Sequence, residues 1–392
     1  MNQKPIRDTY LPYGRQWIDN DDIEAVVEVL KGDFLTTGPF VYKFEEAIAD
    51  YVGAKYAVSF ANGTAALHGA CFAAGITAGD EVITTPLTFA ASANCILYQG
   101  GTPVFADINE KTYNIDPKEI EKCIRPRTKA IIPVDFTGQP ACLDEIGEIA
   151  KKHNLVVIED AAHALGATYR GKKIGSISDM TMFSFHPVKH ITTGEGGMIT
   201  TNNKDYYEKL LQFRTHGITR DPGKLLNNHG PWYYEMQFLG FNYRLTDIQA
   251  ALGISQLQKI DQFIERRTKY AAMYTEAFIN IPEIITPFQD SDGVSSWHLY
   301  VIQLDLTRLS TDRAEIYRTL LDHNIGVNVH YLPIHLLPYY KELGFKHGDL
   351  PISEFLYEAI LTLPLFPLMN ETDVEDVIRA VKETITLYSK GV

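Results

Sequence analysis

Helix-like and strand-like segments alternate along the chain from about residue 22 to residue 260, and this alternation constrains the fold more than any other feature. Apolar residues at helical spacing predict helices at residues 23–30, 44–52 and 143–153. Short runs rich in β-branched and aromatic residues predict strands at residues 56–60, 81–84, 102–105, 130–134 and 156–158. Because strands that alternate with helices are joined by crossovers, we expect an α/β fold whose mostly parallel sheet is covered on both faces.

The pattern changes after a long helix predicted at residues 246–267. Two strands and two helices are predicted in the part that follows, at residues 301–306, 326–330, 312–323 and 374–388. A chain of 392 residues is also longer than one ordinary hydrophobic core supports. We therefore expect two packed domains, a large one at residues 1–260 and a smaller C-terminal α+β domain at residues 261–392.

Charge and hydropathy exclude several classes of partner. The net charge of −13 argues against nucleic acid, which calls for a basic surface, and no apolar run is long enough to span a membrane. The first residues lack the apolar block of a secretory signal, so we expect a cytoplasmic protein. The cysteines show no Cys-x-x-Cys spacing, so we expect free thiols and no metal site from Cys71, Cys95, Cys123 and Cys142.

The first stretch that suggests chemistry is Asn62-Gly63-Thr64-Ala65-Ala66, directly after the first predicted strand. A glycine and small residues at the start of a helix leave backbone N–H groups free, and such groups bind phosphate. Taken alone, the stretch fits a structural interpretation better, in which the glycine makes the turn and Thr64 caps the helix.

The second stretch is the apolar strand at residues 156–158, which ends in Glu159 and Asp160. This position predicts that Asp160 lies at the carboxyl edge of the sheet, where open α/β folds bind their ligands. Acidic residues at strand ends are common, and magnesium binding is the usual alternative.

The third stretch contains Lys189, which lies between the apolar run at residues 182–185 and the glycine-rich turn at residues 192–197. In such surroundings an ammonium group loses solvation and its pKa falls, which is what a lysine that forms a Schiff base requires. A lone lysine is usually a solvated surface residue, so it is the combination of the three stretches that indicates a function.

This combination resembles the fold-type I enzymes that use pyridoxal phosphate (PLP). More narrowly, the chain resembles the DegT/DnrJ/EryC1/StrS family of sugar aminotransferases along nearly its whole length, in segments such as VVIEDAAHALGA (156–167), FSFHPVKHITTGEGG (183–197) and FNYRLTDIQAALG (241–253). The resemblance implies an aspartate aminotransferase-like fold with PLP as cofactor. It also implies that the N-terminal 20 or so residues form a segment that lies near the substrate site.

The resemblance assigns the cofactor residues one by one. It implies that Lys189 carries PLP and moves protons, and that Asp160 accepts a hydrogen bond from the pyridine nitrogen. The other residues that it implies around the cofactor are Gly63, Thr64, Ala65 and Ser184 at the phosphate and Phe89 and His163 at the ring. A core aromatic is the alternative for Phe89. Asn242 matches an asparagine that the partner subunit contributes, which implies a homodimer with shared active sites.

The resemblance also points to residues that bind substrate, although less firmly. These are Tyr13, Asp33, Phe34, Leu35, Thr36, Asn328, Val329, His330 and Tyr331. His330 is equally compatible with a donor to the substrate and with a structural histidine at a strand end. Arg244 has two interpretations as well, since it could balance an anionic group of a substrate or form a buried ion pair.

The reaction that the resemblance implies moves an amino group from L-glutamate to C4 of a UDP-linked 4-keto-6-deoxy-N-acetylhexosamine, as in pseudaminic acid biosynthesis. The alternatives are the same chemistry on another UDP- or dTDP-linked keto sugar, and a catalytically silent PLP-binding regulatory protein. PLP sugar dehydratases carry histidine in place of the lysine, so Lys189 argues against that class. A dinucleotide oxidoreductase is excluded because no G-x-G-x-x-G follows the first strand.

Overall fold

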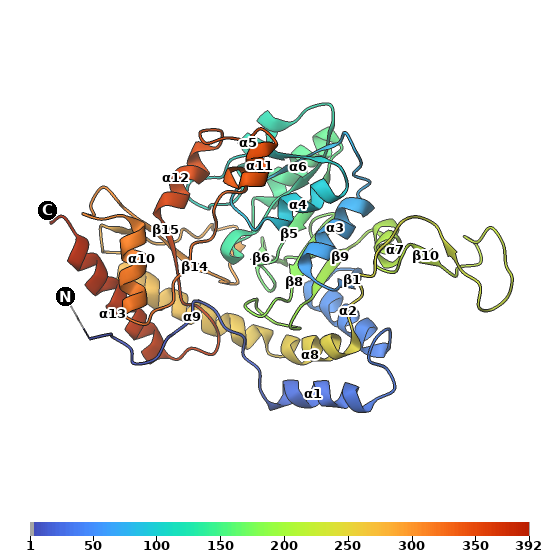
Figure 1. The fold of residues 1–392 in the computed structure, drawn as a ribbon, viewed down its shortest axis with the longest axis horizontal. Helices are drawn as coiled ribbons and strands as arrows, with labels where there is room; N and C mark the ends of the chain where they lie inside the picture. The colour runs from blue at the N-terminus through green and yellow to red at the C-terminus, as the bar shows by residue number, and fades with distance from the viewer. Residues whose placement is uncertain (1–3, 392) are drawn as a thin grey trace.

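A seven-stranded sheet forms the centre of the part of the chain that is predicted as the large domain (Figure 1). The structure is a computed structural model and describes residues 4–391. Residues 1–3, at the start of the first predicted domain, and residue 392, at the end of the second, lie outside the described part. β9 is antiparallel to both of its neighbours, and all other adjacent strands are parallel, which confirms the predicted mostly parallel sheet. In spatial order the strands are β1 (Tyr56–Phe60), β9 (Gly197–Thr201), β8 (Met180–Ser184), β5 (Val156–Asp160), β4 (Thr128–Ile132), β2 (Glu81–Thr84) and β3 (Thr102–Phe105).

Helices cover both faces of this sheet. Successive residues of a strand point to opposite sides, so strands that are apolar throughout need a covering layer on each face. In β5, Val157 belongs to one buried cluster and Ile158 to the cluster on the opposite face. The Val157 face is covered by α2 (Pro39–Val52), α5 (Pro117–Cys123), α6 (Leu143–His153) and α8 (Asp247–Leu257). The Ile158 face is covered by α3 (Gly63–Ala73), α4 (Ala91–Tyr98) and α7 (Lys204–Phe213).

The smaller domain has its own core, built on a three-stranded antiparallel sheet. Leu11 of the N-terminal segment packs into this core, and Arg7 pairs with Asp373 and Asp376. The N-terminal segment is therefore fixed to the smaller domain before it reaches α1 (Asn20–Lys31). The elements of the domain are β12 (Ile284–Ile285), β14 (Tyr300–Leu304), β15 (Ile360–Leu363), α9 (Ile260–Phe278), α10 (Arg313–Asp322) and α13 (Glu371–Tyr388).

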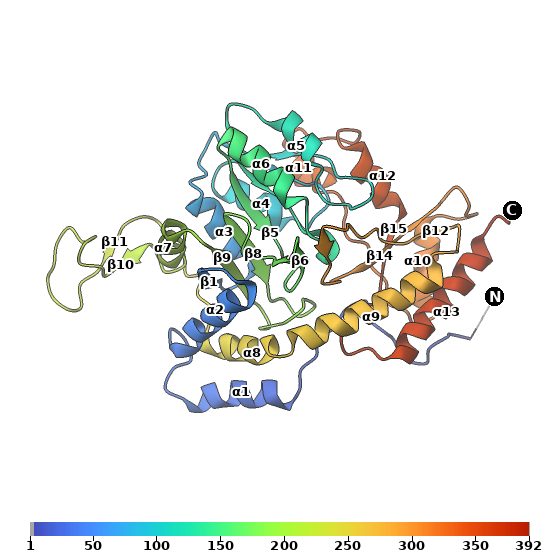
Figure 2. The same ribbon diagram turned by 180° about the vertical axis from the view of Figure 1, so that it is seen from behind.

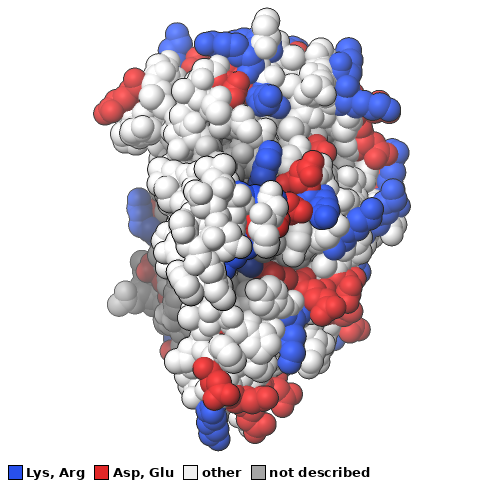
Figure 3. All heavy atoms as spheres, turned by 90° about the vertical axis from the view of Figure 1, so that its right-hand side faces the viewer, with Lys and Arg blue, Asp and Glu red and all other residues white. Residues whose placement is uncertain are grey.

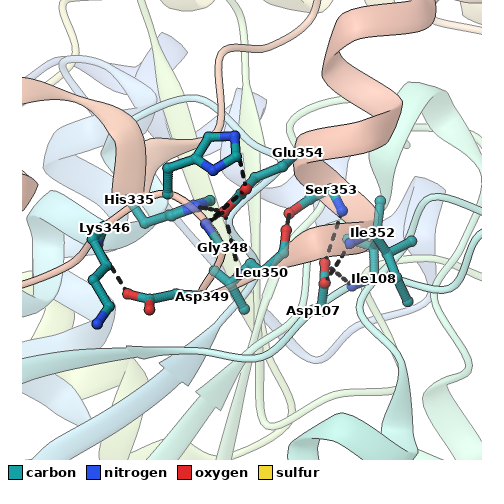
Figure 4. A network of polar contacts seen from close by, with 11 residues as sticks. Asp107, Ile108, His335, Lys346, Gly348, Asp349, Leu350, Ile352, Ser353 and Glu354 are labelled. Carbon is teal, nitrogen blue, oxygen red and sulfur yellow. Dashed lines mark hydrogen bonds and ion pairs between the residues drawn. The ribbon is translucent and has the colours of Figure 1, made fainter.

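One segment of the C-terminal part returns to the large domain. Asp107, which follows β3, accepts hydrogen bonds from the amides of Ile352 (2.9 Å) and Ser353 (3.0 Å) (Figure 4). In the same network, the Glu354 carboxylate lies 2.8 Å from His335 Nε2. These contacts fix the segment that separates residues 328–331 from β15. It contains η2 (Ile334–Leu336), α11 (Pro338–Glu342) and α12 (Pro351–Ala359).

A two-stranded hairpin extends from the body of the molecule (Figures 1 and 2). It consists of β10 (Ile218–Thr219) and β11 (Glu235–Met236), and we call residues 217–240 the arm. Its exposed apolar side chains are Leu226, Trp232, Tyr234, Met236 and Leu239. The remaining short elements are η1 (Phe136–Gly138), β6 (Thr168–Tyr169), β7 (Lys172–Lys173) and β13 (Gly293–Val294).

Two details of the predicted secondary structure are wrong. The helix predicted at residues 246–267 is two helices, because the chain breaks between α8 and α9 at Lys259, whose ammonium contacts Asp19 (2.7 Å) and Asp22 (2.8 Å). The strand predicted at residues 326–330 forms only a single bridge, between Asn328 and Thr362. At one end of this stretch the Gly326 amide donates to the Leu11 carbonyl, and at the other the His330 side chain contacts Thr362.

The surface adds little to the prediction of partners. On the face drawn in Figure 3, acidic and basic side chains are interspersed with large uncharged areas. Within residues 4–391, no helix is both long enough and apolar enough to cross a bilayer. The cytoplasmic location stays a prediction.

Candidate active site

Five of the predicted cofactor residues, Gly63, Thr64, Ala65, Asp160 and Ser184, come from three places along the carboxyl edge of the central sheet. β1 leads into the start of α3, β5 ends at Asp160, and β8 ends at Ser184. Gly197 of β9 pairs with Phe60 on one side and with Ser184 on the other. The ends of β1 and β8 are therefore close neighbours, although they are far apart in the sequence.

The start of α3 has the geometry of a phosphate site. Asn62, not Thr64, caps the helix, and its side chain accepts a hydrogen bond from the Ala65 amide at 2.8 Å. The Gly63 and Thr64 amides donate to no other group within residues 4–391. A Cβ added to Gly63 would lie 3.5 Å from Ser184 Oγ and 3.3 Å from Met182 Sδ. Two free amides beside a hydroxyl fit a phosphate group.

The Asp160 carboxylate is buried at the end of β5 and held in a fixed orientation. Oδ2 accepts a hydrogen bond from Ser92 Oγ at 2.6 Å, and Oδ1 accepts one from the Ala162 amide at 3.1 Å. Burial raises the pKa of Asp160, whereas these hydrogen bonds and the charge of Lys189 oppose the rise. Ser92 was not predicted from the sequence, since a serine in the first turn of a helix carries no signal of such a contact.

Lys189 has the property that a cofactor lysine requires. Its side chain is partly buried, and the loss of solvation lowers the pKa of the ammonium to about 8, with the charge of Asp160 opposing the change and that of Arg267 adding to it. A lysine with this pKa has a substantial neutral fraction near physiological pH and is nucleophilic there. Nζ lies 3.5 Å from Nε2 of His298, a residue to which the sequence assigned no function.

The two residues predicted at the cofactor ring differ in exposure. His163 is buried, and its Nε2 lies 3.2 Å from the Tyr331 hydroxyl. Phe89 is 62% exposed, which excludes the alternative of a core aromatic. The centroid of its ring lies 6.3 Å from that of Tyr331. Both side chains are therefore next to Tyr331.

Most of the predicted substrate residues form one group beside these. The rings of Tyr13 and His330 are 5.3 Å apart, and Asn328 Nδ2 lies 3.4 Å from His330 Nε2. His330 Nδ1 lies 2.8 Å from Thr362 Oγ1, and burial lowers the pKa of His330 to about 3. His330 is therefore neutral at physiological pH. Val329 is partly buried against two core clusters, which gives it a packing function as well.

The other predicted residues lie apart from this group in the single chain. Asp33, Phe34, Leu35 and Thr36 are exposed, in the loop between α1 and α2, and Leu35 accepts a hydrogen bond from the Asp247 amide. Asn242 is exposed as well and forms a bridge with Thr215 at the base of the arm. Their functions stay predictions.

Metal-binding side chains do not cluster in the described part of the chain. Within residues 4–391, no three His, Cys, Asp or Glu side chains are placed to share a metal ion. Arg244, for which the sequence left two interpretations open, forms no ion pair with a carboxylate in that range, and its Nε is buried without a hydrogen-bond partner there. An anionic partner of Arg244 would therefore have to come from a ligand or from a second subunit.

Comparison with known proteins agrees with this geometry. The DegT/DnrJ/EryC1/StrS aminotransferase family matches residues 16–382. The spore coat polysaccharide biosynthesis protein SpsC of Bacillus subtilis is 45% identical, over 97% of this chain and 98% of SpsC. Among solved structures, PseC of Helicobacter pylori, an aminotransferase of pseudaminic acid biosynthesis, has a TM-score of 0.90 at 34% identity, over 97% of this chain and 100% of PseC. The PLP form of the sugar aminotransferase Spr1654 of Streptococcus pneumoniae has a TM-score of 0.90 at 31% identity, over 96% of this chain and 99% of Spr1654.

The chain belongs to the DegT/DnrJ/EryC1/StrS aminotransferase family. It is a PLP-dependent sugar aminotransferase with a fold-type I architecture, and the predictions of family, fold and cofactor are confirmed.

Proposed function

We propose that this chain transfers the amino group of L-glutamate to C4 of a UDP-linked 4-keto-6-deoxy-N-acetylhexosamine. The product is UDP-4-amino-4,6-dideoxy-N-acetyl-β-L-altrosamine, an intermediate of pseudaminic acid biosynthesis. The observation that carries the chemistry is the partly buried Lys189, whose pKa is lowered to about 8 by loss of solvation and which lies within the electrostatic reach of Asp160. The likeness to PseC supports this choice of acceptor.

Lys189 and Asp160 divide the chemistry between them. When bound, PLP supplies an aldehyde that takes the amino group and a ring that accepts the electrons of a carbanion. Asp160 would keep the ring nitrogen protonated, and its hydrogen bonds from Ser92 and Ala162 favour the ionised carboxylate and so oppose the rise in its pKa that burial causes. Lys189 holds the cofactor covalently and, once released, takes a proton from the amino donor and returns it.

Gly63, Thr64 and Ser184 would hold the phosphate group. The two free amides at the start of α3 and the Ser184 hydroxyl would donate to its oxygens, and the dipole of α3 favours a negative charge there. The Ala65 amide belongs to the same turn, although it donates to Asn62 in this structure. Phe89 and His163 would contact the ring, and the Tyr331 hydroxyl contacts His163 and fixes its orientation.

The active enzyme is a homodimer in which Asn242 of each subunit completes the phosphate site of the other. Three features support this proposal. Asn242 is exposed and lies at the base of the arm. The arm carries five large exposed apolar side chains. Residues 33–36 are also exposed, and the bridge between Thr36 and Thr246 places them near Asn242. Exposed apolar groups on an extended hairpin are typical of a surface that a second subunit covers. Residues 33–36 then contact the substrate of the partner's site.

The acceptor has a second candidate, because SpsC resembles the chain at higher identity than PseC does. SpsC acts in spore coat polysaccharide biosynthesis, so another UDP- or dTDP-linked keto sugar fits the same chemistry. The Tyr13, Asn328, His330 and Tyr331 group binds the sugar in either case. His330 is neutral and shares its Nδ1 with Thr362, so its contact with the substrate is a hydrogen bond rather than an ion pair.

A substrate panel distinguishes the two acceptors. The purified protein is incubated with PLP, L-glutamate and either UDP-2-acetamido-2,6-dideoxy-β-L-arabino-hexos-4-ulose or a dTDP-linked 4-keto-6-deoxyhexose, and the nucleotide sugar is followed by mass spectrometry. Replacing the carbonyl oxygen by an amine raises the mass by about one dalton. Amination of the UDP sugar alone supports the proposal; amination of the dTDP sugar alone contradicts the acceptor and leaves the chemistry standing.

A further inference from the structure

Three buried histidines lie close to the Lys189 side chain, and one of them faces its amine. The rings of His163 and His298 are 4.3 Å apart, and those of His190 and His298 are 5.5 Å apart. The Nε2 atom of His163 contacts the Tyr331 hydroxyl, and that of His190 contacts the Ser296 carbonyl. The Nε2 atom of His298 instead lies 3.5 Å from Lys189 Nζ. His298 is 3% exposed, and no residue in the described range contacts its Nδ1 through a hydrogen bond.

The backbone around His298 is fixed by a buried guanidinium. Arg267 Nη1 donates hydrogen bonds to the carbonyl oxygens of Trp297 (3.3 Å), His298 (3.1 Å) and Leu365 (2.8 Å). Within residues 4–391, Arg267 pairs with no carboxylate, so its positive charge is uncompensated there. A rigid backbone beside a fixed positive charge holds the imidazole in place and opposes its protonation.

The hydrogen bond between Lys189 and His298 has a defined direction. Burial lowers the pKa of His298 well below its usual value, and the charges of Lys189 and Arg267 add to this effect. A neutral imidazole has one donor and one acceptor nitrogen, whereas an ammonium group has donors only. Nε2 is therefore the acceptor for a protonated Lys189, and the imidazole proton is on Nδ1.

We propose that His298 is a positioning residue that accepts a hydrogen bond from the Lys189 ammonium and holds this side chain in the site while it carries a proton. The proposal rests on the proposed function of Lys189. A C–H bond of the amino donor breaks as an N–H bond forms on Lys189, and the same proton later leaves Lys189 to form a new C–H bond. His298 gains and loses no proton in these steps, and no oxidant or reductant is needed.

Competitive labelling of Lys189 in the PLP-free protein with acetic anhydride tests this proposal without any catalysis. The extent of labelling is read by peptide mass spectrometry from pH 6 to pH 10 and gives the midpoint of Lys189 titration, which is about 8 in the native chain. In His298→Phe the ammonium loses its acceptor, so the midpoint falls by about one pH unit. His298→Gln, which offers an amide oxygen near the position of Nε2, restores most of the difference.

The neighbouring charges and a matched variant make the result specific. The other titratable or charged groups around the amine are Asp160, His163, His186, His190, Arg267 and His330, and all variants retain them. His323 is also buried with an unpartnered Nδ1 in the described range, but it lies at the end of α10. His323→Phe therefore reproduces the loss of a buried imidazole and leaves the Lys189 midpoint unchanged.

A second readout separates positioning from packing. With PLP bound, the first-order rate of the half-reaction with saturating glutamate falls about tenfold in His298→Phe, and the KM for glutamate changes little. His298→Asn, which cannot reach the position of Nε2, behaves like His298→Phe and serves as the test where the phenylalanine variant does not fold. An unchanged midpoint in folded Phe and Asn variants would overturn the proposal. Failure of Lys189 to bind PLP would be a different result. It would already appear in the native protein, and it would contradict the proposed function rather than the role of His298.

Discussion

The two sides of the candidate site are built in different ways. The side proposed to hold the cofactor consists of residues at the ends of β5 and β8 and at the start of α3, so regular secondary structure positions Asp160, Ser184 and Gly63. The side proposed to contact the sugar consists of Tyr13 and residues 328–331, which have almost no regular structure and are held by side-chain contacts such as that of His330 with Thr362.

This difference teaches which properties can vary without loss of chemistry. Strand ends and helix starts are fixed by the core of the large domain, so the cofactor side tolerates little change. The sugar side depends on contacts between the N-terminal segment, the smaller domain and residues 333–355, which return to the large domain. Changes there alter substrate preference at little cost to the fold.

The largest expected effect is that of Lys189→Ala, which removes the base on the cofactor side. We expect amination to fall by at least about a thousandfold, since a positioned general base contributes on this scale. Lys173→Ala is a matched control, because burial also lowers the pKa of Lys173. Its ammonium lies against the Tyr51 ring and not at the candidate site. Equal activity of the two variants would contradict the account.

Asp160→Asn is expected to come next, because it removes the negative charge and leaves the shape of the side chain. The turnover number falls by about a hundredfold while PLP remains bound, since the amide cannot keep the ring nitrogen protonated. Ser92→Ala removes only one hydrogen bond to the same carboxylate and lowers turnover by about tenfold. A larger loss in Ser92→Ala than in Asp160→Asn would contradict the proposed role of Asp160.

Ser184→Ala is expected to weaken PLP binding by about tenfold, because a hydrogen bond to a charged phosphate is lost. The dissociation constant is measured from the absorbance of bound PLP at increasing concentrations. Excess PLP should restore turnover, which separates this variant from Lys189→Ala, Asp160→Asn and Ser92→Ala. Persistent loss of turnover at saturating PLP would show that Ser184 acts in the chemistry instead.

The smallest expected effect lies on the sugar side. Tyr331→Phe removes the hydroxyl that contacts His163 at 3.2 Å, and we expect the KM for the nucleotide sugar to rise by about threefold to tenfold. The half-reaction with glutamate, measured by stopped-flow absorbance, should change less than the KM does. A large effect on that half-reaction would place Tyr331 on the cofactor side and remove the distinction between the two sides.

Much of the cofactor side could be predicted from the sequence, because each of its parts follows a strand with a clear pattern. The predicted strands at residues 56–60, 81–84 and 102–105 coincide with β1, β2 and β3. The predicted fall in the pKa of Lys189 agrees with its burial in the structure. Ser92 and His298 could not be predicted, since their contacts with Asp160 and Lys189 join segments that are 68 and 109 residues apart and follow no local pattern. The same holds for Arg267, which fixes the His298 backbone.

The sugar side could not be derived from patterns at all, and its residues came only from the family resemblance. The strand predicted at residues 326–330 is a single bridge, because Asn328 and His330 use their polar atoms in side-chain contacts. The break at Lys259 was missed for a related reason, since its partners Asp19 and Asp22 are distant in the sequence.

The central claim is that Lys189 is the lysine that holds PLP, and one measurement tests it most directly. The native protein is saturated with PLP, reduced with borohydride and digested, and the modified peptide is identified by mass spectrometry. The account predicts a phosphopyridoxyl group on Lys189 and on no other lysine, with none after prior incubation with excess L-glutamate. Modification of a different lysine, or of none, would contradict it.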